Sequence, residues 1–378
     1  MVKAGAVAAV ALLFLGAACQ YGVQKTDRLE FRGPSGYRWQ LPEGFPTPRV
    51  PLDNPMTVEK VELGRQLFHD PRLSGDGTVS CASCHRPELA YTDGLNRAVG
   101  SRGIIHPRSA MSLTNVAYNA TLGWDDPTLT LLEDQVLVPL FNTQPLEMGV
   151  AGREEEVLAR FRDDRRYRQL FQKAFPVDED PVSMRNVTYA LASFERTLIS
   201  GNSSYDRWAY GGEVDALDPD EREGARLFFS QRLNCFRCHA GFNLSGPVVY
   251  EGSGTPKAQF HNTGLYNEDG RGAYPTPNTG VHRHSGRIED MGKFRAPTLR
   301  NIALTAPYMH DGSITTLEAV IDHYAAGGHA GNIGPDSVTD NLVAGFELTL
   351  EERRQLVAFL RALTDESLVS RAREESIR

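Results

Sequence analysis

The segment "CASCH" (residues 81–85) constrains the fold most strongly, because it places two cysteines two residues apart with a histidine directly after them. This C-x-x-C-H spacing is the attachment motif of c-type haem. Both thiols bond to the porphyrin edge, and the histidine binds the iron from one side. A second copy, "CFRCH" (235–239), follows in the later half of the chain. The sequence therefore predicts two covalently bound haem c groups, held by Cys81, Cys84, His85, Cys235, Cys238 and His239.

The fifth cysteine marks the N-terminal segment. Lys3 precedes an apolar run that ends in "LFLGAAC", with Cys19 as its last residue. A positive start, a short apolar run and small residues are typical of an export signal, here residues 1–18. Cys19 predicts a lipid anchor on a periplasmic protein, although Gly16 is unusual for a lipoprotein signal and ordinary cleavage stays open.

Zinc is the alternative for two C-x-x-C pairs, since four thiolates form a zinc ribbon. The histidine after each pair and the export signal both favour haem. The formal net charge of −8 and the absence of a basic run argue against nucleic acid as a partner.

The chain repeats itself around the two motifs, and this repeat predicts the fold class. A duplicated helix–motif–loop–helix unit indicates a mainly α protein with two tandem cytochrome-c-like domains joined by long loops. The matched segments are "LGRQLFHDPRL" (63–73) with "EGARLFFSQRL" (223–233), and "AMSLTNVAYN" (110–119) with "APTLRNIALT" (296–305).

The repeat also predicts where the domains lie. We expect an export signal at 1–18, a linker at 19–50, a first cytochrome-c-like domain at 51–205, a second at 206–365 and a polar, solvated tail at 366–378.

Helix signals mark the ends of these domains. Apolar spacing predicts a helix over 184–199, which closes the first domain, and another over 349–363, which closes the second. Asp218 and Pro219 are a capping residue and a first-turn proline, so they begin the helix before the second motif. Residues 240–290 are expected to form a long loop over a haem.

Alignment of the two repeats shows which residues are expected opposite the motif histidine at each iron. "LLEDQVLVP" (131–139) aligns with "TLEAVIDHY" (316–324), which sets Pro139 against Tyr324. Proline has no side-chain atom that binds iron, whereas a tyrosine oxygen is a known haem ligand. The alternative is a core aromatic, because helical spacing turns Tyr324 inward in either case. Competing iron ligands are Met291, Met309, His310 and His323.

Several segments carry a family resemblance. "GKFRAPTLRNIALTAPYMHDGSITTLEAVIDHY" (292–324) and "WDDPTLTLLEDQVLVPLFNTQPLEMG" (124–149), together with the motif at 81–85, resemble the bacterial dihaem cytochrome c peroxidase/MauG superfamily. The resemblance runs from about residue 50 to 363. "SAMSLTNVAYN" (109–119) and "FHNTGLYNEDGRGAYPTPNTG" (260–280) are most similar to its MbnH branch, whose members are associated with copper-binding partners.

The resemblance implies roles for individual residues. In ordinary dihaem peroxidases a methionine ligand stands fourteen residues after the histidine of "PYxHxG"; this position is Tyr324, as in MauG. Peroxide-handling residues fall on Gln135, Pro139 and Glu147, and Trp124 falls between the two haems. A carboxylate above an open iron can shuttle a proton between the two peroxide oxygens, and an amide can orient the peroxide.

The resemblance also implies an inter-haem calcium ion, held by an asparagine side chain and two backbone carbonyls. The carbonyl positions fall on Thr305 and Pro307, but Ser109 stands at the asparagine position and is a poorer ligand. His106 precedes this segment and is a candidate ligand of the first iron in a resting form.

These expectations combine into a periplasmic enzyme that uses hydrogen peroxide to form a high-valent dihaem intermediate. That intermediate would oxidise a partner protein, first of all at tryptophan, by long-range electron transfer. The alternative is a conventional cytochrome c peroxidase that reduces hydrogen peroxide with electrons from a small cytochrome. A third reading, an electron-transfer module without catalysis, requires two six-coordinate irons, which Pro139 disfavours.

Overall fold

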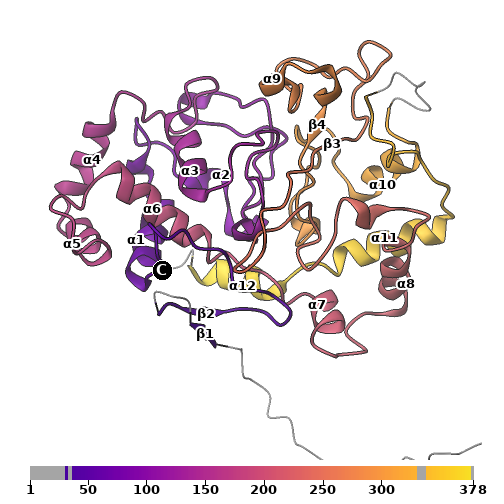
Figure 1. Cartoon of the computed structure of the whole chain (residues 1–378), viewed down its shortest axis with the longest axis horizontal. Coiled ribbons are helices and arrows are strands. Elements are labelled where there is room, and N and C mark those ends of the chain that lie inside the picture. The colour runs from indigo at the N-terminus through magenta and orange to yellow at the C-terminus, as the bar shows by residue number, and fades with distance from the viewer. Residues whose placement is uncertain (1–29, 33–35, 330–337, 376–378) are drawn as a thin grey trace, which may run out of the picture.

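Two pairs of crossing helices organise the two halves of the molecule. In the first half, α1 (Val58–His69) packs on α6 (Met184–Glu195). In the second half, α8 (Pro219–Phe228) packs on α11 (Leu350–Arg361). Figure 1 shows the first pair on the left and the second on the right. The helices begin where the sequence supplies capping side chains, at Thr57, Ser183, Asp218 and Thr349.

Each pair crosses at a glycine, and the two glycines are equivalent in the repeat. A Cβ atom on Gly64 would lie 2.0 Å from the carbonyl oxygen of Ala190, and one on Gly224 would lie 2.0 Å from that of Gln355. No side chain fits at such a distance, so glycine is required for the backbones to approach this closely.

A second pair of equivalent residues follows the cysteine motifs. Asn115 and Asn301 both adopt the left-handed conformation, with φ of 58° and 59°, which asparagine tolerates better than most residues. The backbone amide of Asn115 donates to the carbonyl oxygen of Leu198 (2.8 Å), just beyond α6. The backbone amide of Asn301 donates to that of Leu363 (2.9 Å), just beyond α11. The sequence repeat therefore corresponds to a repeat of local structure at these positions.

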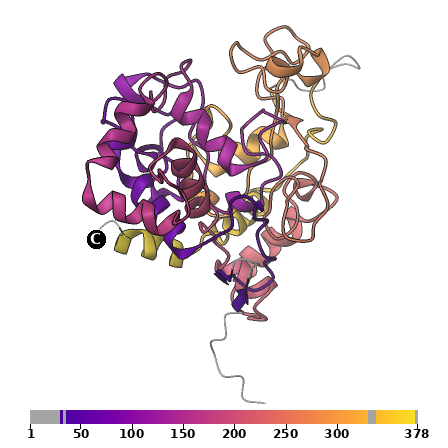
Figure 2. The ribbon, with the colours of Figure 1, turned by 60° about the vertical axis from the view of Figure 1, so that its left-hand side comes forward.

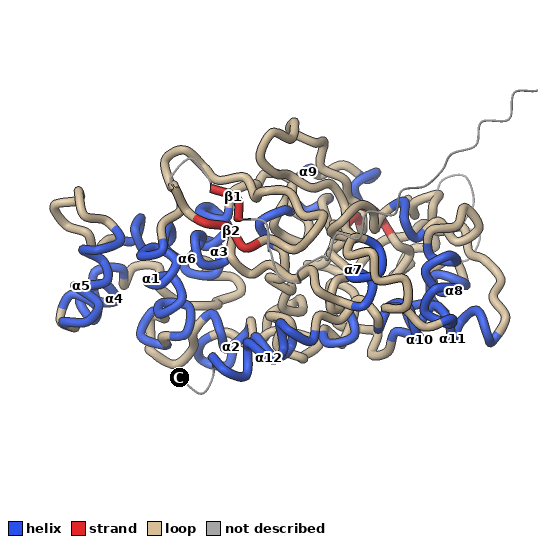
Figure 3. The backbone as a smooth tube through the Cα atoms, turned by 90° about the horizontal axis from the view of Figure 1, so that it is seen from below, coloured by secondary structure: helices blue, strands red, loops and turns tan. Residues whose placement is uncertain are grey.

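The computed structural model describes residues 30–32, 36–329 and 338–375, and over them the protein is mainly helical with long loops (Figure 3). The predicted export signal and Cys19 lie outside these residues. Within them, no helix is long and apolar enough to span a bilayer. The remaining helices are α2 (Cys81–Cys84), α3 (Leu132–Phe141), α4 (Glu154–Arg162), α5 (Arg165–Ala174), α7 (Ser204–Ala209), α9 (His282–Ser285), α10 (Leu317–Ala325) and α12 (Glu366–Glu375).

The described strands form two short antiparallel pairs, which we call hairpins. In the first, β1 (Glu30–Arg32) pairs with β2 (Arg38–Gln40). In the second, β3 (His261–Asn262) pairs with β4 (Lys293–Phe294). This second hairpin joins the ends of the long loop in the second half, on the side that faces the first half (Figure 1).

The later part of the predicted linker is packed rather than free. Trp39, Leu41 and Phe45 are buried in a cluster with Met56 and Tyr118, which we call the Trp39 cluster. The Phe45 and Tyr118 rings meet edge to face with centroids 5.9 Å apart. Apolar burial of aromatic side chains explains why this segment is held against the first half.

The predicted solvated tail, 366–378, also differs from the structure. Residues 366–375 form α12, and Leu368 is buried in the hydrophobic core of the first half. Figures 1 and 2 agree that α12, which follows the last helix of the second half, lies beneath the first half. The chain thus returns to its first core after completing the second.

Candidate functional site

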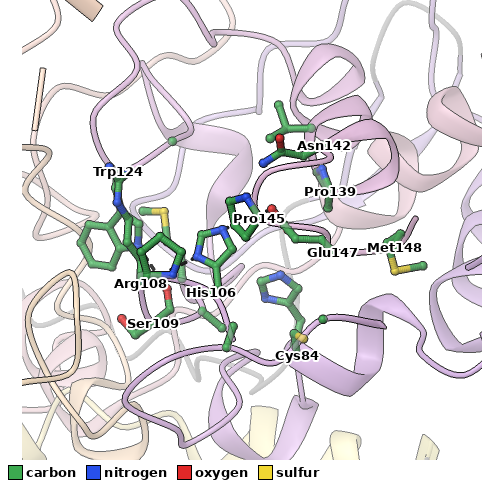
Figure 4. Close-up of a pocket in the computed structure, with 18 of the residues that line it drawn as sticks. Cys84, His106, Arg108, Ser109, Trp124, Pro139, Asn142, Pro145, Glu147 and Met148 are labelled. Carbon is green, nitrogen blue, oxygen red and sulfur yellow. Dashed lines mark hydrogen bonds and ion pairs between the residues drawn. The ribbon is translucent and has the colours of Figure 1, made fainter. Parts of the chain in front are cut away.

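A cavity of about 1390 Å³ opens beside the first cysteine motif. Its walls come mainly from the loop after α2 and from α3, and three residues of the second half close one side: Pro277, Arg283 and Arg295. Figure 4 shows the pocket with Cys84 at its lower edge and Trp124 to one side. The predicted site residues that line it are Cys81, Cys84, His85, Ser109, Trp124, Gln135, Pro139 and Glu147.

The histidine of each motif is held at one ring nitrogen. His85 Nδ1 lies 2.9 Å from the carbonyl oxygen of Tyr91, and His239 Nδ1 lies 3.1 Å from that of Pro297. A carbonyl at Nδ1 fixes the proton there and leaves Nε2 free to bind a metal. Burial lowers the pKa of His85, and lowers that of His239 to about 4, so both rings are neutral near pH 7 as metal ligands must be.

The wall opposite Cys84 carries an acid–base pair. His106 Nε2 lies 3.3 Å from Glu147 Oε1, and His106 Nδ1 accepts a hydrogen bond from the amide of Arg108 at 3.2 Å. In Figure 4 both side chains lie beside Pro145, and Glu147 also lies near Pro139. The Nδ1 contact leaves the proton on Nε2, which then donates to the carboxylate. Both imidazole nitrogens of His106 are thus engaged in this conformation.

Helix α3 brings Gln135 and Pro139 to this cavity one turn apart. Pro139 lies within the helix, where it has no amide hydrogen to donate. In the second half α10 begins at Leu317, the counterpart of Leu132 at the start of α3, so Tyr324 occupies the position that Pro139 has in α3.

A buried carboxyl group that the sequence did not single out also lines the cavity. Glu195 ends α6 with 5% of its surface exposed, and its Oε2 has no hydrogen-bond partner among the described residues. Burial raises its pKa to about 8, partly opposed by the nearby Arg196. Glu195 is therefore largely protonated and uncharged near pH 7.

Trp124 lies where segments of the two halves meet. Its backbone hydrogen-bonds directly to the second half, and its indole hydrogen-bonds to Ser109, which itself contacts the second half. The indole Nε1 donates to the carbonyl oxygen of Ser109 at 3.2 Å, and the Trp124 carbonyl accepts from the amide of Arg295 at 2.8 Å. The Ser109 amide in turn donates to the carbonyl oxygen of His310 at 3.0 Å. Trp124 therefore sits at the boundary between segments of both halves.

The structure does not test the predicted calcium site. The Ser109 hydroxyl donates to the carbonyl oxygen of Met309 at 3.2 Å, so its proton is already engaged. Thr305 and Pro307 lie in the segment just before Met309. Calcium at Ser109, Thr305 and Pro307 stays a prediction.

Two arginines near Trp124 differ in how their charge is balanced. Arg108 forms a bidentate pair with the buried Asp125, at 2.6 and 2.7 Å. Arg295 is also buried, but its guanidinium meets only the carbonyl oxygen of Gly123 (3.3 Å) and Met111 Sδ (3.9 Å), with no carboxylate partner among the described residues. Burial lowers the pKa of Arg295 to about 10. A buried cation of this kind requires an anionic group.

Around the second motif, burial raises the pKa of the Tyr324 phenol well above the usual value, and the nearby Cys235 and Cys238 add to this effect. A phenolate ligand would therefore form only where a metal displaces the proton. His261 lies nearby with its Nδ1 2.6 Å from Asp340. Its hydrogen bonds to Asp340 and Cys238 raise its pKa to about 10.

Comparison with known proteins gives the family of this chain. Residues 58–214 match the family model described as di-haem cytochrome c peroxidase. MauG, the methylamine utilization protein of Methylorubrum extorquens, is 38% identical over 87% of this chain and 84% of its own length. The cytochrome-c peroxidase IdrP1 of Pseudomonas sp. strain SCT is 34% identical over 85% and 84%.

The chain belongs to the dihaem cytochrome c peroxidase/MauG family. It is therefore an oxidoreductase of a family that acts with hydrogen peroxide. The crystal structure of a MauG-like protein associated with microbial copper homeostasis superposes with a TM-score of 0.85 at 46% identity, over 88% of this chain and 97% of that one. The fold is also that of the dihaem peroxidase BthA of Burkholderia thailandensis (TM-score 0.65, 22% identity).

The residues present fit the two haem c groups that the family implies. The cavity at the first motif presents both cysteines and a neutral His85 with Nε2 free, and Arg295 offers a buried positive charge for a propionate. The zinc alternative does not fit, because no group of three or more Cys, His, Asp or Glu side chains gathers in the part of the chain that is described. The two cysteine pairs belong instead to separate halves, in α2 and in the turn at Cys235–Arg237.

Three features of the site had no clear signal in the sequence. The contact between His106 and Glu147 joins residues that are far apart in the chain. Arg295 and Glu195 become notable only because folding buries them without full partners.

Proposed function

We propose that this protein is a peroxide-dependent oxidase of a partner protein, built from two tandem cytochrome-c-like units with one haem each, at about 51–205 and 206–365. The observation that carries the proposal is the difference between equivalent helices: α3 offers Pro139 where α10 offers Tyr324. Tyr324 would supply an oxygen ligand to a haem at the second site, whereas Pro139 would supply no ligand at the first, which would leave room there for peroxide.

At the first site, the side chains around Glu147 manage protons. The haems, when bound, supply the electrons that hydrogen peroxide takes up. Glu147 accepts a proton from one peroxide oxygen and returns it to the other, while His106 Nε2 holds the carboxylate in place at 3.3 Å. Gln135 orients the peroxide through its amide, and Pro139 adds no competing ligand.

At the second site, His239 and Tyr324 would hold a haem that supplies storage for oxidising equivalents, and Trp124 would couple it to the first. A buried anionic oxygen ligand favours oxidised iron. Similarity to a MauG-like protein associated with copper homeostasis supports an MbnH-like role, in which the partner is an exported copper-binding protein oxidised at tryptophan.

The proposed setting is the periplasm, with Cys19 as a lipid anchor after removal of residues 1–18. Conversion of Cys19 to serine should then move the protein from the membrane fraction to the soluble periplasmic fraction. Unchanged partition would support ordinary cleavage.

The central experiment treats the dihaem enzyme with hydrogen peroxide and a candidate exported copper-binding partner, and then measures partner tryptophans by mass spectrometry. We expect oxygen addition to a partner tryptophan with the wild type, and its loss in Tyr324→Met. The rival function, a conventional cytochrome c peroxidase, is favoured by equally extensive similarity to enzymes of that name. Rapid oxidation of a reduced small cytochrome, with no change in any partner tryptophan, would establish the rival instead.

A further inference from the structure

The loop between β3 and β4 carries two tyrosines that pack against residues after the second repeat segment. Tyr274 is buried at 4% exposure, with its ring centroid 5.4 Å from that of Tyr266 and 6.0 Å from that of His310. His310 stacks on Phe294 at 3.8 Å and an interplanar angle of 13°. Trp124 packs against the same cluster.

The outer tyrosine of this cluster has a carboxylate as its hydrogen-bond partner. The Tyr266 hydroxyl donates to Asp311 Oδ2 at 2.5 Å, the short end of the range for an O–H···O⁻ bond. Asp311 also accepts from the Ser313 amide at 3.1 Å. Although burial opposes ionisation of Asp311, these hydrogen bonds lower its pKa overall, so it is ionised and ready to take a proton.

The two tyrosines of this cluster differ in their exposure to solvent. Tyr266 is only partly buried, whereas Tyr274 is enclosed in the cluster against which Trp124 packs. The two phenol rings therefore lead from the neighbourhood of Trp124, through a buried ring, to a ring that reaches the surface. Neighbouring rings 5.4 Å apart are close enough for electrons to pass between them.

We propose that Tyr266 is a redox-active tyrosine through which oxidising equivalents leave the buried haems, with Asp311 as its proton acceptor. This inference rests on the proposed function and adds the exit point on the surface. A protein partner would dock over Tyr266, beside the β3–β4 hairpin.

The step balances with the oxidant that the family uses. Hydrogen peroxide takes up two electrons, which the haem groups would supply when bound, and two protons from solvent, and becomes two waters. Tyr266 returns one electron by way of Tyr274, and its phenolic proton moves to Asp311 Oδ2. A partner tryptophan then gives an electron to the phenoxyl oxygen, and the proton returns from Asp311. A second electron transfer along the same route completes the two-electron oxidation of the tryptophan, which takes its new oxygen from water and releases two protons to solvent.

The test identifies where a radical forms in the dihaem enzyme. Peroxide is added with a nitroso spin trap, and peptide mapping by mass spectrometry locates the adduct. We expect the trap on Tyr266 in the wild type, its loss in Tyr266→Phe and reduced labelling in Asp311→Asn, which keeps the phenol but removes the proton acceptor. Tyr250→Phe is the matched control, because Tyr250 is also partly buried but packs in the Trp39 cluster, and it should not alter the adduct.

A second readout is freeze-quench electron paramagnetic resonance with ring-deuterated tyrosine, which narrows a tyrosyl signal. An unlabelled Tyr266 in the wild type, or a tyrosyl signal of equal size in Tyr266→Phe, would overturn the proposal. If Tyr266→Phe fails to bind haem, equal labelling of Tyr266 in Asp311→Asn and wild type would overturn the role of the carboxylate. Haem absorbance separates the two proposals: no change on peroxide addition would refute the proposed function, whereas a change without a Tyr266 adduct would refute only the exit route.

Discussion

Replacement of Glu195 by glutamine should flatten the dependence of stability on pH. In the folded protein, burial raises the pKa of Glu195 to about 8, from an ordinary value of 4.5 that unfolding restores. Between these values the folded state holds a proton that the unfolded state has released, so the free energy of unfolding falls as pH rises. The stabilising contribution is complete below about pH 4.5 and is lost as pH passes about 8. At about 1.4 kcal/mol per pH unit, the loss amounts to at most about 5 kcal/mol.

Glutamine keeps the shape of the neutral acid but cannot ionise, so the difference between the two proteins isolates this proton. The assay is denaturant unfolding of the dihaem protein at intervals from pH 5 to pH 8.5. As the pH is raised through this range, we expect the free energy of unfolding of Glu195→Gln to increase relative to that of the wild type. Glu179→Gln, at an exposed position, is the control and should follow the wild type. Parallel profiles for Glu195→Gln and wild type would refute the assignment of a protonated Glu195.

Three further results are expected. Glu147→Gln should keep both haems, as judged by the optical spectrum, and slow the reaction with peroxide by about 10²–10⁴-fold in stopped flow; a wild-type rate would remove Glu147 from proton transfer. Gly224→Ala should lower the free energy of unfolding by about 1–3 kcal/mol or more, whereas Gly254→Ala, where a Cβ meets no atom within 4 Å, should be close to neutral. Thorough chelation, with metal loss measured, should reduce electron exchange between the haems if calcium binds at Ser109; unchanged exchange would argue against a functional ion there.

The parts of the fold that the sequence predicted depend on local spacing. The two C-x-x-C-H motifs are apparent from the sequence alone, and in the structure a backbone carbonyl lies at Nδ1 of each histidine, which leaves Nε2 free. The repeat identified Gly64 with Gly224, and the structure gives both the same close approach to a neighbouring helix. The predicted cap at Asp218 is confirmed, because a cap needs only residues within one turn.

The parts that could not be predicted depend on contacts between distant segments. Nothing near Tyr266 in the sequence indicates that Asp311, 45 residues later, accepts a hydrogen bond from its hydroxyl. Arg295 looks like an ordinary polar residue until folding buries it away from every described carboxylate. The expectation of a solvated tail was wrong for Leu368, since one apolar residue in a charged segment carries too little pattern to indicate burial.

The path of α12 has a consequence for how the duplicated halves depend on each other. A duplication by simple fusion gives two modules that can be separated at the join and expressed alone. Here the segment that follows the second half supplies Leu368 to the core of the first. Ser200, near the end of the first half, donates from its hydroxyl to Asp365, at the end of the second, at 3.0 Å. We therefore expect the two halves to depend on each other for folding, so that neither half expressed alone would keep this packing.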